Sequence, residues 1–300
     1  MPDWGEILQE IQSVPHPVDT VRRGYLSALH KKTGRNIIAY YSAWLQRTGT
    51  MQEKTAVSDE DKNAFMTTIH HLDPTLGLDL ILHTPGGDLT ATESIVSYLR
   101  SIFGTNIRVI VPQIAMSAGT MIACSAKEII MGKQSNLGPT DPQFGVVPCQ
   151  AVVQEFEEVI AAIKKDPASI PIWQTMVGKY HPAFVQQCRA AIELSGEMVH
   201  NWLMDGMFFG DDNAKEKVKN ITDYLLSFKT NKVHSRHLDT AKCIELGLKI
   251  SYMEEDNELQ DLILSVHHSF MHTITYNPNV CKIVENHDGR AMFLNSSESH

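Results

Sequence analysis

The chain has 300 residues, 43% hydrophobic and 20% charged, with a formal net charge of −9 at pH 7. This is the composition of a globular protein with a sizeable core, and the negative charge argues against a nucleic-acid partner because phosphate binding requires a basic surface. No apolar run of about 18 residues occurs, so we expect no membrane-spanning helix. The N-terminus lacks a basic-then-apolar signal, which predicts a cytoplasmic protein.

The first third of the chain begins with helical apolar spacing over residues 4–12, which predicts a short amphipathic arm that Pro15 and Pro17 interrupt. Residues 36–42 read as a buried strand and residues 46–57 as a polar loop. A helix is expected from Ser58 to about His71, because Asp61 places an acid in its first turn.

Strands and helices then alternate between residues 78 and 131. In chain order the sequence predicts a strand over 78–83, a helix over 90–103, a strand over 106–112, a helix over 117–126 and a strand over 128–131. Such alternation is typical of a parallel sheet with helices packed on it, so the fold class is α/β.

The rest of the chain is mostly helical. We expect helices over 149–164, 170–180, 183–208, 211–228 and 256–274, a late strand over 249–253 and a hairpin turn at 286–290. The predicted organisation is an N-terminal helical arm (1–35), a main domain with a helical C-terminal part (36–275), and a hairpin with a flexible tail (276–300). The five cysteines are widely spaced without a CxxC pair, which predicts reduced thiols.

Two segments, each placed between a strand and a helix, carry the residues typical of acyl transfer. In His83-Thr-Pro-Gly-Gly-Asp88, the consecutive Gly86 and Gly87 can turn backbone amides toward a ligand oxygen. In Ala115-Met-Ser-Ala-Gly119, the Ser117 hydroxyl is exposed at the sheet end and the Ala118 amide lies at a helix N-terminus, which favours an oxyanion. Either segment alone is weak evidence, but Ser117 follows Gly87 by 30 residues, which is one strand-loop-helix-strand unit.

That combination resembles the Clp protease proteolytic subunit and signal peptide peptidase A. A longer likeness, to the serine dehydrogenase proteinase family, rests on Leu137-Gly-Pro-Thr-Asp-Pro-Gln143, Trp202-Leu203, Met207-Phe208, Val233-His-Ser-Arg-His-Leu-Asp239 and Leu246-Gly-Leu248. The resemblance implies a Clp/crotonase-type repeated β-β-α superhelix with helical C-terminal additions. It also implies that Ser117 is the nucleophile and that the amides of Gly87, Asp88 and Ala118 are candidates for the oxyanion hole.

The general base that must activate the serine stays open. The Clp subunit has a histidine about 25 residues after its serine, where this chain has Asp141. Signal peptide peptidases use a lysine, for which Lys164, Lys165 and Lys179 are candidates, whereas His234 and His237 are the histidine alternative. Asp141 is a candidate to orient the base, and Met116 to line a side-chain pocket. Each of these residues also has a purely structural interpretation. The lysines fit a solvated helix face, the histidines a helix cap, the aspartate a turn and the methionine the core.

Three functions are compatible with the sequence. The favoured one is a serine peptidase acting on peptides or unfolded protein; the others are an acyl-CoA-binding crotonase-like enzyme and a catalytically silent scaffold. By analogy with related folds we expect a homo-oligomer. Because the chain has no GxxxxGK[ST] loop, any unfolding ATPase or activator would be a separate chain. No cofactor is expected, and no metal, since His268 and His272 have zinc-pair spacing without the accompanying glutamate.

Overall fold

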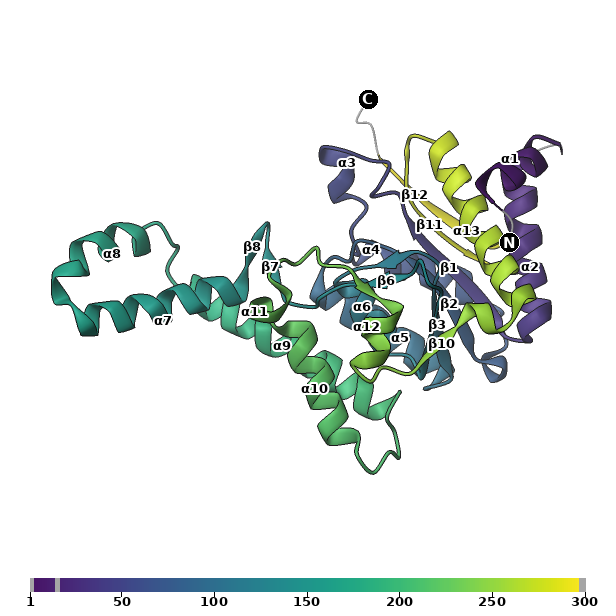
Figure 1. Cartoon of the computed structure of the whole chain (residues 1–300). Coiled ribbons are helices and arrows are strands. Elements are labelled where there is room, and N and C mark those ends of the chain that lie inside the picture. Colours follow the sequence, from purple (N-terminus) through teal and green to yellow (C-terminus); the bar gives the residue numbers. More distant parts are fainter. Residues whose placement is uncertain (1–2, 14–16, 297–300) are drawn as a thin grey trace.

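A computed structural model describes residues 3–13 and 17–296 (Figure 1). The helices, in chain order, are α1 (Trp4–Ser13), α2 (Pro17–Thr33), α3 (Thr50–Glu53), α4 (Glu60–Ile69), α5 (Leu89–Phe103), α6 (Ala118–Cys124), α7 (Cys149–Lys165), α8 (Ile170–Val177), α9 (Phe184–Asp205), α10 (Ala214–Leu226), α11 (Phe228–Asn231), α12 (Thr240–Glu245) and α13 (Asn257–Tyr276). The strands are β1 (Asn36–Ser42), β2 (Leu78–His83), β3 (Ile107–Val111), β4 (Ile114–Ala115), β5 (Glu128–Met131), β6 (Asn136–Leu137), β7 (Gln143–Phe144), β8 (Val147–Pro148), β9 (Leu238–Asp239), β10 (Ile250–Tyr252), β11 (Val280–Asn286) and β12 (Ala291–Asn295).

The main sheet has the strand order β10-β5-β3-β2-β1-β11-β12. The strands from β10 to β1 run parallel, β11 pairs antiparallel with β1, and β12 pairs antiparallel with β11. Every residue of β1 and β2 is buried, as expected of parallel strands covered on both faces. The predicted parallel sheet and hairpin turn are therefore confirmed, although the hairpin belongs to the main sheet rather than forming a separate tail.

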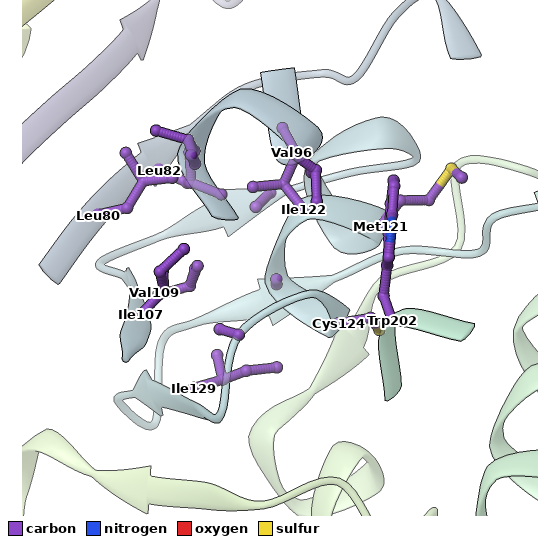
Figure 2. Close-up of a cluster of buried hydrophobic side chains, with 14 of the residues drawn as sticks. Leu80, Leu82, Val96, Ile107, Val109, Met121, Ile122, Cys124, Ile129 and Trp202 are labelled. Carbon is purple, nitrogen blue, oxygen red and sulfur yellow. The ribbon is translucent and has the colours of Figure 1, made fainter. Parts of the chain in front are cut away.

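Helices cover both faces of this sheet. Successive strand residues point to opposite faces, so each face packs its own set of side chains. On one face, Leu80 and Leu82 of β2 pack with Val109 of β3 and with Val96 and Ile122 from helices α5 and α6 (Figure 2). On the other face, alternate strand residues pack against α2 and α13. The result is a mixed α/β architecture of three layers, in agreement with the predicted fold class.

The helical segments differ from expectation at the N-terminus and in the middle of the chain. Helix α1 buries Ile7 and Ile11 against the α2 region, and α2 packs on α13, so the N-terminal helices belong to the body instead of forming an arm. The projecting element is the α7–α8 pair, which extends away from the sheet (Figure 1). The predicted loop 46–57 contains the short helix α3, and the predicted helix 211–228 is divided at Ser227. The predicted break at Pro15 lies outside the described residues. Of the predicted flexible tail from Asn295 to the C-terminus, Asn295 is the last residue of β12, and residues 297–300 lie outside the described residues.

A second, smaller sheet prepares the site. It has the order β4-β6-β9, with β4 and β6 parallel and β6 and β9 antiparallel. Ala115 pairs with Leu137, and Leu137 pairs with Leu238, so segments far apart in the sequence meet at one edge of the main sheet. This sheet therefore fixes the positions of three loops: the two that follow β4 and β6, and the one that precedes β9.

Two expectations from composition concern the whole chain. All five cysteines are buried and unpaired, which agrees with the predicted reduced thiols. Among residues 3–13 and 17–296, no helix has both the length and the apolar character that crossing a bilayer requires.

Candidate active site

Ser117 occupies a strained turn between β4 and α6. Its backbone has φ 51° and ψ −115°, a region that residues with a side chain rarely adopt. The serine is half-buried, and its side chain makes no capping hydrogen bond to α6. Strain of this kind concentrates at functional sites. The geometry is that of a nucleophile elbow, which presents the hydroxyl at the end of the sheet.

The glycine loop between β2 and α5 lies directly against this turn. Gly86 has φ 94° and Gly87 has φ 159°. A Cβ atom added to Gly86 would lie 2.6 Å from the Cβ of Ser117 and 2.8 Å from the amide nitrogen of Ala118. No side chain fits at this position, so glycine allows the two backbone segments to approach each other as closely as an oxyanion site between them requires.

The available amide donors differ in part from those expected. Within the described residues, the amides of Gly87 and Ala118 donate to no acceptor of the chain. The Gly86 amide donates to the Thr84 hydroxyl at 3.2 Å. The Asp88 amide donates to the Val57 carbonyl at 2.9 Å and is therefore already used. The prediction that the Asp88 amide is an oxyanion donor is therefore wrong. The Asp88 carboxylate is the N-cap of α5 and accepts a hydrogen bond from the Ala91 amide at 2.8 Å.

A histidine and an aspartate form a hydrogen-bonded pair at the same place. His234, in the loop before β9, has its Nδ1 atom 2.9 Å from Oδ1 of Asp141. Asp141 is 1% exposed, and the other carboxylate oxygen has no partner among the described residues. The second ring nitrogen of His234, Nε2, is thus left for another group.

The small sheet brings these three residues together. Ser117 follows β4 by two residues, Asp141 follows β6 by four, and His234 precedes β9 by four. Because β4, β6 and β9 are hydrogen-bonded neighbours, their loops meet on one side of the molecule. The order along the chain is Ser, Asp, His, the order of the triad in α/β hydrolases.

Ser117 and His234 line one cavity of 620 Å³. Its wall also includes the glycine loop and the apolar side chains of Trp44, Leu89, Phe144 and Leu194.

The other predicted site residues lie outside this cavity. Lys164, Lys165 and Lys179 are exposed on the projecting α7–α8 pair, which is called the α7–α8 arm below, and do not line the cavity. Met116 is buried, and its Cε lies 2.5 Å from where a Gly138 Cβ would be, so it packs beneath the site and not in the cavity wall.

Sequence reasoning missed one wall of the cavity. This wall consists of Gln52, Thr55 and Ala56, from the segment predicted to be a polar loop, and of Trp44, which lies just before that segment. The neighbouring Val57 pairs with the glycine loop through a bond from its amide to the Gly86 carbonyl at 2.8 Å. No local pattern in the sequence indicates this pairing, since it joins residues about thirty positions apart.

His83, at the end of β2 just before the glycine loop, makes stability sensitive to acid. Burial lowers the pKa of His83 to about 4, and the nearby Ile114 carbonyl offsets only part of this effect. Because the unfolded imidazole has a pKa of about 6.5, protonation favours the unfolded chain as pH falls from about 6.5 to about 4. Between pH 7 and 4.5 we expect His83 to reduce the free energy of unfolding by about 2–3 kcal/mol.

Urea unfolding of the wild type and of His83→Phe at both pH values measures this contribution. Other groups titrate in both proteins, so the difference between them isolates His83. Stability of the variant should depend less on pH by the stated amount; an equal dependence would assign the acid sensitivity to other groups.

The described residues contain no group of three or more histidines, cysteines, aspartates or glutamates placed to hold a metal ion. His272, one of the pair with zinc-like spacing, instead bonds through Nε2 to the Trp4 carbonyl at 3.0 Å. Its ring also packs on that of Trp4, with centroids 3.9 Å apart. This histidine therefore has a structural role at the contact between α1 and α13.

Comparison with known proteins finds one matching family and two similar proteins. The family model for ClpP-like SDH-type serine proteinases matches residues 52–288. Two uncharacterized proteins of Methanocaldococcus jannaschii are also similar. One is 30% identical over 195 residues, which are 65% of this chain and 59% of that protein. The other is 32% identical over 194 residues, 65% and 60% of the two lengths. The chain thus matches less than two thirds of the length of these curated relatives.

Proposed function

The chain belongs to the family of ClpP-like SDH-type serine proteinases, and on that premise we propose that it hydrolyses peptide bonds with a Ser117–His234–Asp141 triad. The observation that carries this proposal is the 2.9 Å bond between His234 and Asp141 beside the cavity that Ser117 also lines. A base must reach the serine directly or through one water. His234 lines the same cavity as Ser117, whereas the lysines of α7 and α8 do not. The repeated β-β-α superhelix of the related folds is part of the same proposal, supported by the order β3, β4, α6.

The reaction follows from the positions of these groups. His234 Nε2 takes the proton of the Ser117 hydroxyl while the oxygen attacks the peptide carbonyl. The oxygen of the tetrahedral intermediate becomes negative and accepts hydrogen bonds from the Gly87 and Ala118 amides. Protonated His234 then gives its proton to the leaving amine, and the buried Asp141 carboxylate stabilises the imidazolium. Water, activated by His234, hydrolyses the acyl-enzyme and restores Ser117.

The substrate class we propose is a peptide or an unfolded segment of protein. Support comes from the mixed character of the cavity, where apolar side chains such as Trp44 and Leu194 lie beside polar ones such as Gln52 and Thr90. Such a wall accommodates apolar side chains of a peptide and leaves hydrogen-bonding groups for its backbone.

Covalent labelling with a fluorophosphonate probe tests the proposal. We expect stoichiometric labelling that peptide mass spectrometry locates at Ser117 and that Ser117→Ala abolishes. Circular dichroism of both proteins controls for folding. Absence of labelling in folded wild-type protein would overturn the proposal and favour a silent scaffold, whereas tight binding of a coenzyme A thioester would favour a crotonase-like enzyme.

We also propose that the protein forms a homo-oligomer through the α7–α8 arm. The arm exposes Ile160 (54%) and Ile172 (67%), and apolar side chains of this size are usually covered. Sedimentation equilibrium of the wild type and of Ile172→Glu tests this proposal, since a monomeric wild type would contradict it.

We further propose that a separate ATPase or activator supplies unfolded substrate. Peptide hydrolysis that no ATPase stimulates, together with full activity on unfolded protein, would contradict this proposal.

A further inference from the structure

An ion pair is buried behind the active site. Nζ of Lys282 on β11 lies 2.6 Å from Oδ1 of Asp61 on α4, and the two side chains are 2% and 0% exposed. Neither residue lines the active-site cavity. Removing two charges from water is costly, and a buried ion pair is weak evidence for a contribution to stability. The question is therefore what the two side chains hold in place.

Lys282 holds the segment that pairs with the glycine loop. Its ammonium group donates to the Ala56 carbonyl at 2.9 Å and to the Ser58 hydroxyl at 3.1 Å. Between these residues, Val57 donates to the Gly86 carbonyl at 2.8 Å and accepts from the Asp88 amide at 2.9 Å. One side of the glycine loop is therefore fixed by Lys282 through residues 56–58.

Asp61 holds the same segment and is itself held by Tyr40. Oδ2 of Asp61 accepts from the Ser58 amide at 2.9 Å and from the Tyr40 hydroxyl at 2.9 Å. Tyr40 is 1% exposed, so no water competes for these bonds.

We propose that Lys282, Asp61 and Tyr40 are positioning residues that set the direction of the Gly87 amide by holding residues 56–58, which pair with the glycine loop. The proposal rests on the peptidase function proposed above, in which that amide binds the oxyanion. The network touches neither substrate nor nucleophile; it acts through Val57.

Tyr40→Phe tests the network with the least disturbance, because it removes one hydroxyl and keeps the ion pair and the ring. We expect the maximal labelling rate by a fluorophosphonate probe to fall by about 10- to 100-fold, with the probe concentration for half-maximal rate unchanged. Hydrogen exchange of the peptide covering residues 84–88 should become faster.

Tyr41→Phe is the matched control. Tyr41 is the next residue of β1 and is equally buried, but it faces the opposite side of the sheet, where its hydroxyl lies 3.2 Å from Nδ1 of His267. This variant loses a hydroxyl of the same kind without reaching the glycine loop. Its labelling rate should remain within twofold of the wild type.

The other possible outcomes separate failure of the positioning network from failure of the proposed peptidase function. Labelled wild type with unchanged labelling and exchange in Tyr40→Phe would overturn the positioning network and leave the peptidase standing. Equal slowing in both variants would also overturn it, because general destabilisation would then explain the loss. Unlabelled wild type would overturn both. If Tyr40→Phe fails to fold, the charge-neutral Asp61→Asn/Lys282→Met pair takes its place, with the same results expected.

Discussion

Replacing His234 with alanine is expected to lower kcat for a peptide substrate by about 10⁶-fold, because Ser117 then loses the group that accepts its proton. The hydrogen bond to Asp141 at 2.9 Å orients the imidazole, and the ring lies on the cavity that Ser117 lines. The labelling rate of Ser117 by a fluorophosphonate probe should fall in parallel. Both rates are measured at the pH of maximal wild-type activity.

His237 provides the matched control for this variant. It lies three residues further along the same loop, is exposed and lines a different surface depression. His237→Ala should keep wild-type rates. The alanine variants of Lys164, Lys165 and Lys179 separate the two kinds of base: a large loss in one of them, with activity retained in His234→Ala, would establish a serine–lysine dyad and refute the triad.

The central fold could be predicted because its signals are local. The apolar runs of β2 and β3 and the helix between them follow directly from residue type and spacing, and the Gly86–Gly87 pair marks the turn that follows β2. The Asn286–Arg290 turn likewise predicted the hairpin. Each of these features depends on residues close together in the sequence.

The position of the proposed base, His234, could not be predicted because it depends on strand pairing at long range. Nothing within the loop 232–237 indicates that Leu238 will pair with Leu137, yet that pairing places His234 beside Asp141. Spacing relative to Clp and signal peptide peptidases directed attention to lysines of the arm instead. In this chain the position about 25 residues after the serine holds the aspartate, and a later loop supplies the histidine.

The buried network behind the glycine loop was missed for a related reason. Lys282 lies in the apolar run Val280–Val284, where a lysine in a buried strand signals a paired charge, but the sequence does not identify the partner. Only the register of β11 against β1 brings Lys282 next to Asp61 of α4. A buried charge could have been inferred from sequence, whereas its connection to the oxyanion loop required the structure.

Replacing Asp141 with asparagine is expected to lower kcat by about 10⁴-fold while leaving the fold and the unfolding midpoint nearly unchanged. The aspartate accepts a hydrogen bond from Nδ1 of His234, so Nε2 carries the lone pair that receives the serine proton. An asparagine amide can donate to Nδ1 instead, which places the proton on Nε2 and prevents it from acting as a base. NMR of the imidazole nitrogens should show this change of tautomer.

Asp239→Asn is the control, since Asp239 caps α12 by accepting from the Lys242 amide at 2.8 Å and asparagine caps a helix equally well. Its kcat should match the wild type. If Asp141→Asn also retained full activity, His234 would not need an orienting carboxylate and the triad would be reduced to a Ser117–His234 pair. A large loss in Asp141→Asn with the tautomer unchanged would instead show that the buried charge, which stabilises the imidazolium in the transition state, is the main contribution of Asp141.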